Sequence, residues 1–395
     1  MRKSLLGLGV ACAMFALTSV AAAQQTVKVG LIAPFSGGFA IWGEQFQRAV
    51  KAFQKVNGES VKGVKVEVLY RDVGGPNPAK SKQLAEELVL RDKIKFLTGF
   101  AFTPNALAVA DVVNEAKVPT IIMNAATSVI TRRSPLFVRV SMTLPQQTGP
   151  LGQWAAAKGY KKIYTLVSDY GPGHDAELQF VKSFKAAGGT IINSVRVPLA
   201  TTDFAPYFEN VLQAKPDAMF LFMPAGPPSI GAIDTWAKRG LKAAGIPLLV
   251  TGETQEIYLP AIGDIALDVI SAGHYGTEVD TPENAVLKKT LADMFGANSL
   301  PDIASVAAWD GMRLIYDAIE ALGPNAPGEK YIDFMKGRKM KSPRGPIEID
   351  AVERDIIQNV YIRRVVRKDG KLVNATIDTI RAVKDPWKLD NPAAK

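Results

Sequence analysis

The sequence predicts an α/β protein with parallel sheets flanked by helices. Between residues 27 and 276, short β-branched or aromatic segments alternate with amphipathic helical segments. Several of the short segments are apolar on both faces, which is typical of parallel strands buried under helices. A third observation, a basic and then apolar N-terminus, predicts that the folded part of the chain is exported.

Ten strands are expected in this alternating region. Strand–helix–strand repetition implies right-handed crossovers and parallel pairing. The expected strands are 27–33, 64–71, 95–99, 119–123, 136–141, 162–168, 190–197, 217–223, 247–251 and 268–276.

Helices are expected between these strands because apolar residues recur at helical spacing and stop signals follow them. Phe46, Val50 and Phe53 share one face of a first helix, which Asn57-Gly58 would end. A long helix is expected over 302–322, with Gly323 as its stop.

The last 50 residues change character. Segments 347–349 and 360–366 alternate like antiparallel strands, and Asp369-Gly370 has the composition of a hairpin turn. The tail after Pro386 is expected to be peripheral.

The N-terminus reads as a secretory signal peptide over residues 1–23. Arg2 and Lys3 precede an uncharged run, and Ala21 and Ala23 suit cleavage before Gln24. The only cysteine, Cys12, lies inside this run. Lipid anchoring at Cys12 would need a fuller apolar run before it, so full cleavage is favoured, with a mature chain lacking disulfides and thiol nucleophiles.

The mature chain is long enough for two domains of ordinary size. Removing Arg2 and Lys3 from the 47 basic residues leaves 45 against 38 acidic ones, a net charge of +7. The positive residues are scattered, which argues against nucleic-acid binding. No apolar stretch after Ala23 reaches the length of a membrane span. We find no motif of a catalytic, nucleotide-binding or metal site, so no enzyme activity, cofactor or metal is expected.

An ordered set of motifs resembles the leucine/isoleucine/valine-binding proteins, the periplasmic receptors of ATP-driven importers. Each motif is short, and their order and spacing together carry the resemblance over nearly the whole mature chain. The motifs lie at 30–37, 42–43, 57–58, 99–103, 118–119, 124–127, 137–140, 168–171 and 342–346.

The resemblance implies a type I periplasmic binding protein fold, in which two Rossmann-like lobes are joined by three crossing strands and close around a solute. It implies one lobe from 24–140 plus 276–343 and another from 141–275 plus 344–385, with a tail at 386–395. It also implies a periplasmic monomer that delivers a small-molecule carboxylate to the membrane permease of an ABC importer.

Two threonines are expected to grip the ligand carboxylate. Thr103 precedes Pro104, so it suits a helix N-cap. The same position offers free N–H groups and a positive dipole end to an anion. Thr127 is either a plain turn residue or, by the resemblance, the second half of this grip, with the carbonyl of Ala125 lining the pocket.

Three aromatic residues are expected at the cleft. Trp42 could be core, but it falls where the resemblance implies an aromatic residue at the cleft mouth, able to stack on the ligand. Phe102 fits either core or cleft. Tyr170 begins a loop before a helix, which suits a contact from the second lobe.

The chain departs from the amino-acid receptors in the loop at 224–228. Where they supply a tyrosine, this loop contains Ala225 and several prolines. Glu253 matches the glutamate that pairs with a ligand ammonium, although it could be a solvated loop residue, and Glu256 nearby leaves the register open. Tyr275 is expected to line the cleft at the second crossing.

The motifs indicate a ligand class and leave its identity open. Branched-chain amino acids are the default that the resemblance implies. The missing tyrosine and the residues Trp42 and Phe102 slightly favour an aromatic acid. A ligand-sensing module for a signalling receptor and an exported enzyme are the alternative functions, and the enzyme has the least support.

Overall fold

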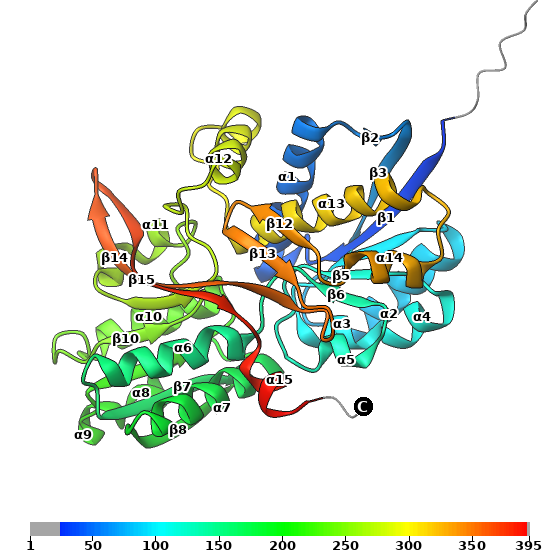
Figure 1. Ribbon diagram of the computed structural model, residues 1–395. Coiled ribbons are helices and arrows are strands. Elements are labelled where there is room, and N and C mark those ends of the chain that lie inside the picture. Colours follow the sequence, from blue (N-terminus) through cyan, green and yellow to red (C-terminus); the bar gives the residue numbers. More distant parts are fainter. Residues whose placement is uncertain (1–23, 393–395) are drawn as a thin grey trace, which may run out of the picture.

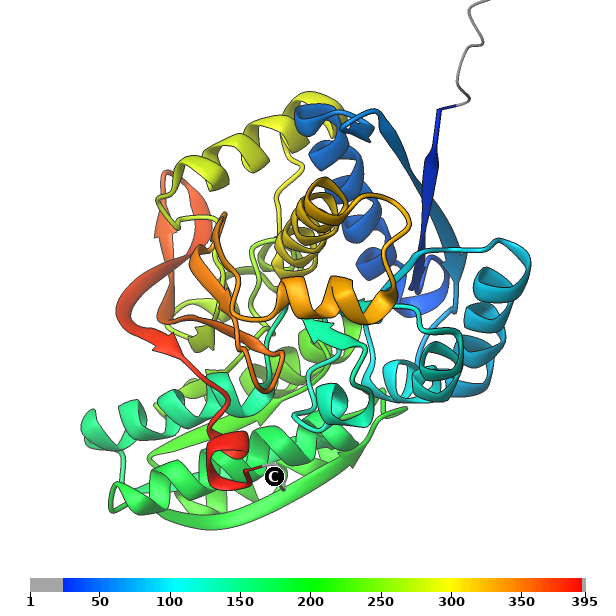
Figure 2. The ribbon, with the colours of Figure 1, turned by 45° about the vertical axis from the view of Figure 1, so that its right-hand side comes forward.

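The computed structural model describes residues 24–392. The predicted signal peptide and Cys12 lie outside the described residues. The chain forms two α/β bodies that lie side by side, one coloured mainly blue, cyan and gold and the other mainly green (Figure 1; Figure 2).

The first body is built on a six-stranded sheet in the order β2-β3-β1-β4-β5-β6. All neighbours are parallel except β2 and β3. Its strands are β1 (Thr26–Ala33), β2 (Ser60–Val61), β3 (Val64–Asp72), β4 (Phe96–Gly99), β5 (Thr120–Ile122) and β6 (Phe137–Arg139).

Two sets of helices pack with this sheet. One set lies between its strands in the sequence, and the other comes from a later segment of the chain that returns to the first body. The early set is η1 (Gly37–Phe39), α1 (Ala40–Asn57), α2 (Pro78–Glu86), η2 (Glu87–Arg91), α3 (Thr103–Ala108), α4 (Ala110–Ala116) and α5 (Ile130–Arg133). The returning set is α12 (Pro282–Phe295), α13 (Ile303–Leu322) and α14 (Gly328–Met335). The ring of Phe53 on α1 meets Trp309 and Tyr316 of α13 edge-on, at 5.2 and 5.0 Å between ring centres.

The second body is built on a nine-stranded sheet in the order β12-β13-β14-β11-β10-β9-β7-β8, with β15 beside β14. Its strands are β7 (Lys162–Asp169), β8 (Thr190–Pro198), β9 (Ala218–Phe222), β10 (Leu248–Val250), β11 (Ile270–Gly273), β12 (Lys339–Ser342), β13 (Gly345–Ile349), β14 (Ile356–Lys368) and β15 (Lys371–Val383). Its helices are α6 (Leu144–Ala157), α7 (Gly171–Ala186), α8 (Ala205–Phe208), α9 (Val211–Ala214), α10 (Pro227–Lys238), α11 (Leu259–Ile262), η3 (Gly263–Ala266) and α15 (Pro386–Asp390).

The alternating part of the chain folds as predicted. Every expected strand between 27 and 276 is present, with shifts of a few residues at its ends, and β7 to β11 pair in parallel. The antiparallel pairing predicted for the end of the chain is also confirmed, because β14 and β15 form a hairpin. Asp369 and Gly370 in its turn have φ values of 50° and 75°, the left-handed backbone that a two-residue hairpin turn requires.

Buried Arg344 ties together segments that pass between the two bodies. Its guanidinium donates to Asp310 Oδ2 on α13 at 2.6 Å, to the carbonyls of Val140 and Ser141 after β6, and to Gln358 Oε1 on β14 at 3.0 Å. The guanidinium of Arg344 therefore joins helix α13 to the segment after β6 and to strand β14. The assignment of the chain to two lobes that move relative to each other stays a prediction.

The sequence predicted a peripheral C-terminal segment, and this prediction is wrong. Lys388 on α15 is only 4% exposed, and its ammonium contacts Asp355 and the hydroxyl of Thr131 on α5. The ring of Trp387 lies 5.2 Å from the guanidinium carbon of Arg132. Since α15 also packs against α6, it contacts both bodies (Figure 2).

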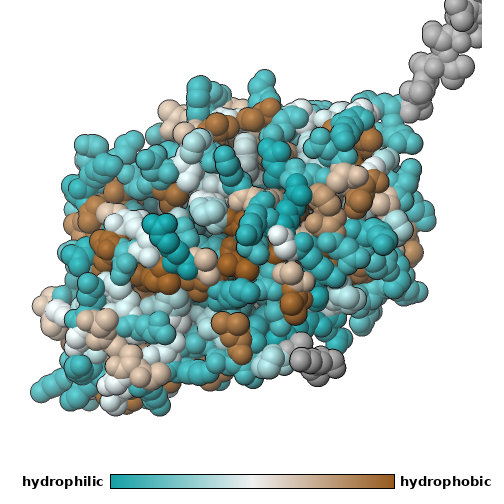
Figure 3. Space-filling view, in the orientation of Figure 1, coloured by the Kyte–Doolittle hydropathy of each residue, from teal (hydrophilic) through white to brown (hydrophobic). Residues whose placement is uncertain are grey.

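The visible face of the molecule is mostly hydrophilic, with apolar side chains scattered singly or in small groups (Figure 3). This agrees with the solvated surface that the charge distribution predicted. Within residues 24–392, the helices are each too short or too polar to cross a bilayer.

Candidate functional site

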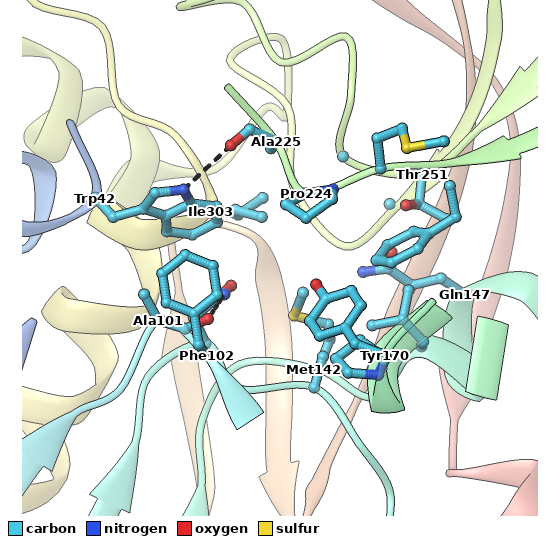
Figure 4. A pocket seen from close by; sticks show the side chains of 18 of the residues that line it. Trp42, Ala101, Phe102, Met142, Gln147, Tyr170, Pro224, Ala225, Thr251 and Ile303 are labelled. Atoms are coloured by element: carbon cyan, nitrogen blue, oxygen red, sulfur yellow. Dashed lines mark hydrogen bonds between the residues drawn. The ribbon is translucent and has the colours of Figure 1, made fainter. Parts of the chain in front are cut away.

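A pocket lies between the two bodies, where loops follow the carboxyl ends of strands from both sheets (Figure 4). Open α/β sheets commonly bind ligands at this edge. The first body and the residues just after β6 contribute Trp42, Ala101, Phe102, Asn124, Ala126, Met142 and Ile303. The second body contributes Leu144, Gln147, Tyr170, Pro172, Phe222, Met223, Pro224, Ala225, Thr251, Gly252, Gly273 and Arg363.

The pocket is small. About 50 Å³ is open to the centre of a water-sized sphere. One water needs roughly 10–15 Å³ of such space, so the pocket holds about four waters. A molecule with a single six-membered ring displaces about that much water, so the size suits a small one-ring solute.

Aromatic side chains form much of the wall. Phe102 meets Phe39 edge-on at 4.9 Å, and Tyr170 stacks on Phe222 at 6.4 Å, which holds both pairs in place. Trp42 is 5% exposed, and its Nε1 donates across the pocket to the carbonyl of Ala225 at 3.3 Å (Figure 4). This bond joins the head of α1 to the loop after β9, so it closes one side of the pocket.

Of the candidate ligand-binding residues, Trp42, Phe102, Tyr170 and Ala225 lie on the pocket wall. Their contact with a ligand stays a prediction.

A few polar groups interrupt the apolar lining. Asn124 donates from Nδ2 to the carbonyl of Ala101 at 2.7 Å, which leaves its Oδ1 as an acceptor. Gln147 Nε2 lies 2.9 Å from His274 Nδ1. Burial and the nearby arginines 344 and 363 lower the pKa of His274 well below its usual value, so this imidazole is neutral.

Arg363 on β14 supplies the only formal charge among the described residues that line the pocket. The residue is 1% exposed. Its guanidinium donates to the carbonyl of Tyr275, to Ser271 Oγ at 3.2 Å and to the carbonyl of Thr251 at 3.4 Å. All three acceptors are neutral. Burial lowers the pKa of Arg363, while the more distant Glu256 and Glu253 act in the opposite direction.

The sequence did not single out Arg363, although the strand pattern contains a clue. Side chains alternate between faces along a strand, so Tyr361, Arg363 and Val365 share one face. Tyr361 and Val365 are both buried. An arginine between two apolar residues on a buried face is unusual, and this pattern could have nominated it.

The predicted threonine pair lies just behind the pocket wall. Thr103 and Thr127 are 4% and 7% exposed, and their hydroxyl oxygens lie 3.0 Å apart in a mutual hydrogen bond. Helix α3 begins at Thr103, and Phe102 takes the cap position, so the expected N-cap bond from Thr103 does not form. Gly171 of the second body lies against both side chains.

Ala125 and Tyr275 also lie outside the lining. Ala125 is 1% exposed, and its N–H donates to the carbonyl of Phe100, while its neighbours Asn124 and Ala126 face the pocket. The hydroxyl of Tyr275 donates to Asn284 Oδ1 at 2.7 Å, away from the pocket. Tyr275 acts on the pocket through its carbonyl, which holds Arg363.

Glu253 is fully buried behind Thr251. Its carboxylate accepts hydrogen bonds from the N–H of Met223 at 2.9 Å, from the N–H of Thr251 at 2.7 Å and from Thr251 Oγ1 at 3.1 Å. The alternative of a solvated loop carboxylate is therefore wrong. These bonds tie the loops after β9 and β10 together, and pairing with a ligand ammonium stays a prediction.

The buried carboxyl of Glu253 should make stability depend on pH. Burial raises its pKa from 4.5 to about 7, so the folded state holds this proton more tightly than the unfolded state. Stability should therefore fall as the pH rises from 4.5 to 7. The Glu253→Gln variant has no carboxyl to titrate here, so its free energy of unfolding lacks this dependence. Between pH 4.5 and 7, the free energy of unfolding of wild type should therefore fall by up to about 3 kcal/mol relative to that of the variant. Urea unfolding at several pH values measures the difference, and a constant difference would contradict the assignment.

Within residues 24–392, no group of three or more histidine, cysteine or acidic side chains is arranged to hold a metal ion. The pocket contains aromatic surface, a few hydrogen-bonding groups and one cation. This arrangement can bind and orient a small solute.

The chain matches known proteins over nearly its whole length. The periplasmic binding protein family model covers residues 26–371. The "Leu/Ile/Val-binding protein homolog 6" of Brucella melitensis biotype 1 is 42% identical over 378 residues, 95% of this chain and 97% of the relative.

Two solved structures are equally similar. A solute-binding protein of an ABC transporter from R. palustris, in complex with 4-hydroxybenzoate, is 45% identical, with a TM-score of 0.90 over 93% of this chain and 100% of that one. Another, from Rhodopseudomonas palustris BisB5 in complex with 3,4-dihydroxybenzoic acid, is 43% identical, with a TM-score of 0.88 over 92% and 99%. The chain therefore belongs to the periplasmic binding proteins, has their type I fold and is a solute-binding protein of an ABC transporter.

Proposed function

We propose that this protein is the extracytoplasmic receptor of an ABC importer for a small aromatic carboxylate. The observation that carries the proposal is the pocket itself, which has room for one ring, has aromatic walls and contains a single positive side chain. Offset and edge-on contacts with Trp42 and Phe102 would hold an aromatic ring. The solved relatives that bind hydroxybenzoates support the same ligand class.

Capture would occur by closure of two lobes on a hinge. The pocket draws its walls from both bodies, so a ligand completes all its contacts only when they meet. Binding then shifts the population toward the closed form, which the membrane permease would recognise. The bond from Trp42 to the carbonyl of Ala225 would form on closure. We propose a monomer that reaches the periplasm after cleavage before Gln24, and that binds its ligand without turnover.

A branched-chain amino acid is the second candidate, favoured by the name of the Brucella relative. Its ammonium would have to be desolvated in a pocket whose one charged side chain is Arg363. Asn124 Oδ1 is an acceptor open to it, but a neutral acceptor offsets less of the lost hydration than a carboxylate does. The aromatic acid therefore fits the pocket better.

Calorimetric titration and thermal unfolding with 4-hydroxybenzoate, 3,4-dihydroxybenzoate and leucine test the proposal. We expect the aromatic acids to raise Tm by several degrees, since a ligand at 100 times its Kd stabilises a protein by about 2.7 kcal/mol. Small-angle scattering of the same samples should give a smaller radius of gyration with ligand. Tight binding of leucine together with no response to either aromatic acid would overturn the ligand class.

A further inference from the structure

We infer that the guanidinium of Arg363 binds the ligand carboxylate, and that the threonine pair at 103 and 127 does not. The inference rests on the proposed function. It moves the anion site from a helix start in the first body to the strand β14 in the second.

The first argument is the unmet charge of Arg363. A guanidinium has five N–H donors, and the three contacts described above use three of them. One N–H on each terminal nitrogen is left. Over residues 24–392, no carboxylate oxygen lies within 4 Å of Arg363. Glu256 and Glu253 act on Arg363 only from beyond that distance. Burying a cation with no counter-charge in contact is costly, and a carboxylate that accepts from both terminal nitrogens would offset that cost.

The second argument is the space beside Arg363. Gly273 ends β11 and lines the pocket, and a Cβ there would lie 2.5 Å from Arg363 Nη2. At Gly276 a Cβ would lie 3.4 Å from Nη1. Two positions without side chains therefore flank the guanidinium. Gly273 and Arg363 both line the pocket, so the missing side chain at Gly273 leaves Nη2 on the pocket side, where an anion can reach it. On the other flank, Glu256 Oε1 would lie 3.5 Å from the same Cβ at Gly276.

The third argument is the state of the threonine pair. The two hydroxyls bond each other, both residues are more than nine-tenths buried, and neither lines the pocket. A Cβ at Gly171 would lie 3.1 Å from Thr127 Oγ1, so the second body covers the pair when the pocket is formed. A ligand carboxylate would have to displace this contact to reach them.

Gln147 can assist at the same end of the pocket. Its amide has two N–H donors, and one of them faces His274 Nδ1. Because His274 is neutral, it neither repels Arg363 nor pairs with the ligand. The second N–H of Gln147 is then available to a carboxylate oxygen.

The test compares a charged ligand with its neutral amide. The variants are Arg363→Met and Arg363→Lys, and the controls are Thr103→Val and Thr127→Val. Titrations use 4-hydroxybenzoate and 4-hydroxybenzamide, which differ only in the carboxylate. We expect Arg363→Met to weaken benzoate binding at least 100-fold and benzamide binding less than 5-fold. Arg363→Lys should recover part of the benzoate affinity, and the threonine variants should bind benzoate within 5-fold of wild type.

Binding of the amide also shows that each variant is folded, and thermal unfolding without ligand gives an independent check. If Arg363→Met binds benzoate like wild type, or loses both ligands equally while folded, the inference is wrong. It is also wrong if the threonine variants lose benzoate selectively. If wild type binds leucine and no aromatic acid, the proposed ligand class fails on its own, and leucine with leucinamide then tests Arg363 in the same variants.

Discussion

Replacing Asp310 with asparagine is expected to lower the free energy of unfolding by about 3–5 kcal/mol, the cost of removing one partner from a buried ion pair. Asp310 and Arg344 are each 1% exposed, and the carboxylate faces the guanidinium at 2.6 Å. Asparagine keeps the size of the side chain and removes its charge, so the charge of Arg344 would remain buried without compensation. Urea unfolding of the ligand-free protein measures the effect.

Asp317→Asn is a matched control on the same helix. Asp317 pairs with Arg338 at 2.7 Å near the surface, where the arginine side chain is 32% exposed. Water and side-chain entropy reduce such pairs to about 0–1 kcal/mol. If Asp310→Asn lowers the free energy of unfolding by no more than Asp317→Asn does, then Asp310 is not what compensates the buried charge of Arg344.

The strands of the two sheets could be predicted because their burial shows directly in the sequence. Segments such as 162–169 and 218–222 are apolar on both faces, since helices cover both sides of a parallel sheet. Strand β12 escaped prediction because two of its four residues are lysines with exposed side chains. For strand β15 the sequence predicted only the hairpin turn at Asp369-Gly370 and no strand bounds, because most of the side chains of this strand are polar or exposed.

The parts of the pocket that are formed by residues close in sequence could be predicted. The parts where distant segments meet could be predicted less well. Motifs at the strand ends identified the turns that hold Trp42, Phe102, Tyr170 and Ala225. They could not tell which residue of a turn faces the pocket. Several predicted residues therefore lie one layer behind the wall, namely Thr103, Ala125, Thr127, Glu253 and Tyr275.

Arg363 shows what sequence reasoning lacked. It is 90 residues after the end of β11, and only the antiparallel pairing of β14 with β11 brings it beside Gly273 and Ser271. Local patterns do not contain that pairing. The sequence could therefore indicate Arg363 only as an arginine on a buried strand face, without showing that it lines the pocket.

Gly276→Ala provides the baseline for the last prediction. A Cβ at Gly276 would lie 3.4 Å from Arg363 Nη1, which is ordinary contact. The guanidinium can stay where it is, so this variant should bind 4-hydroxybenzoate within about 3-fold of wild type, a difference below 1 kcal/mol.

Gly273→Ala is expected to weaken 4-hydroxybenzoate binding by about 10- to 100-fold, or about 1.4–2.8 kcal/mol. The added Cβ would lie 2.5 Å from Nη2 and 2.9 Å from Cζ of Arg363, so the guanidinium must move. This displacement strains the three hydrogen bonds that hold the guanidinium, so it costs some stability. It also moves the two free N–H groups out of the geometry in which one carboxylate accepts from both, and that geometry supplies much of the strength of a bidentate pair. Titration and thermal unfolding of both glycine variants measure the two effects separately. Equal benzoate affinity in Gly273→Ala and Gly276→Ala would show that the position of the guanidinium does not matter to the ligand.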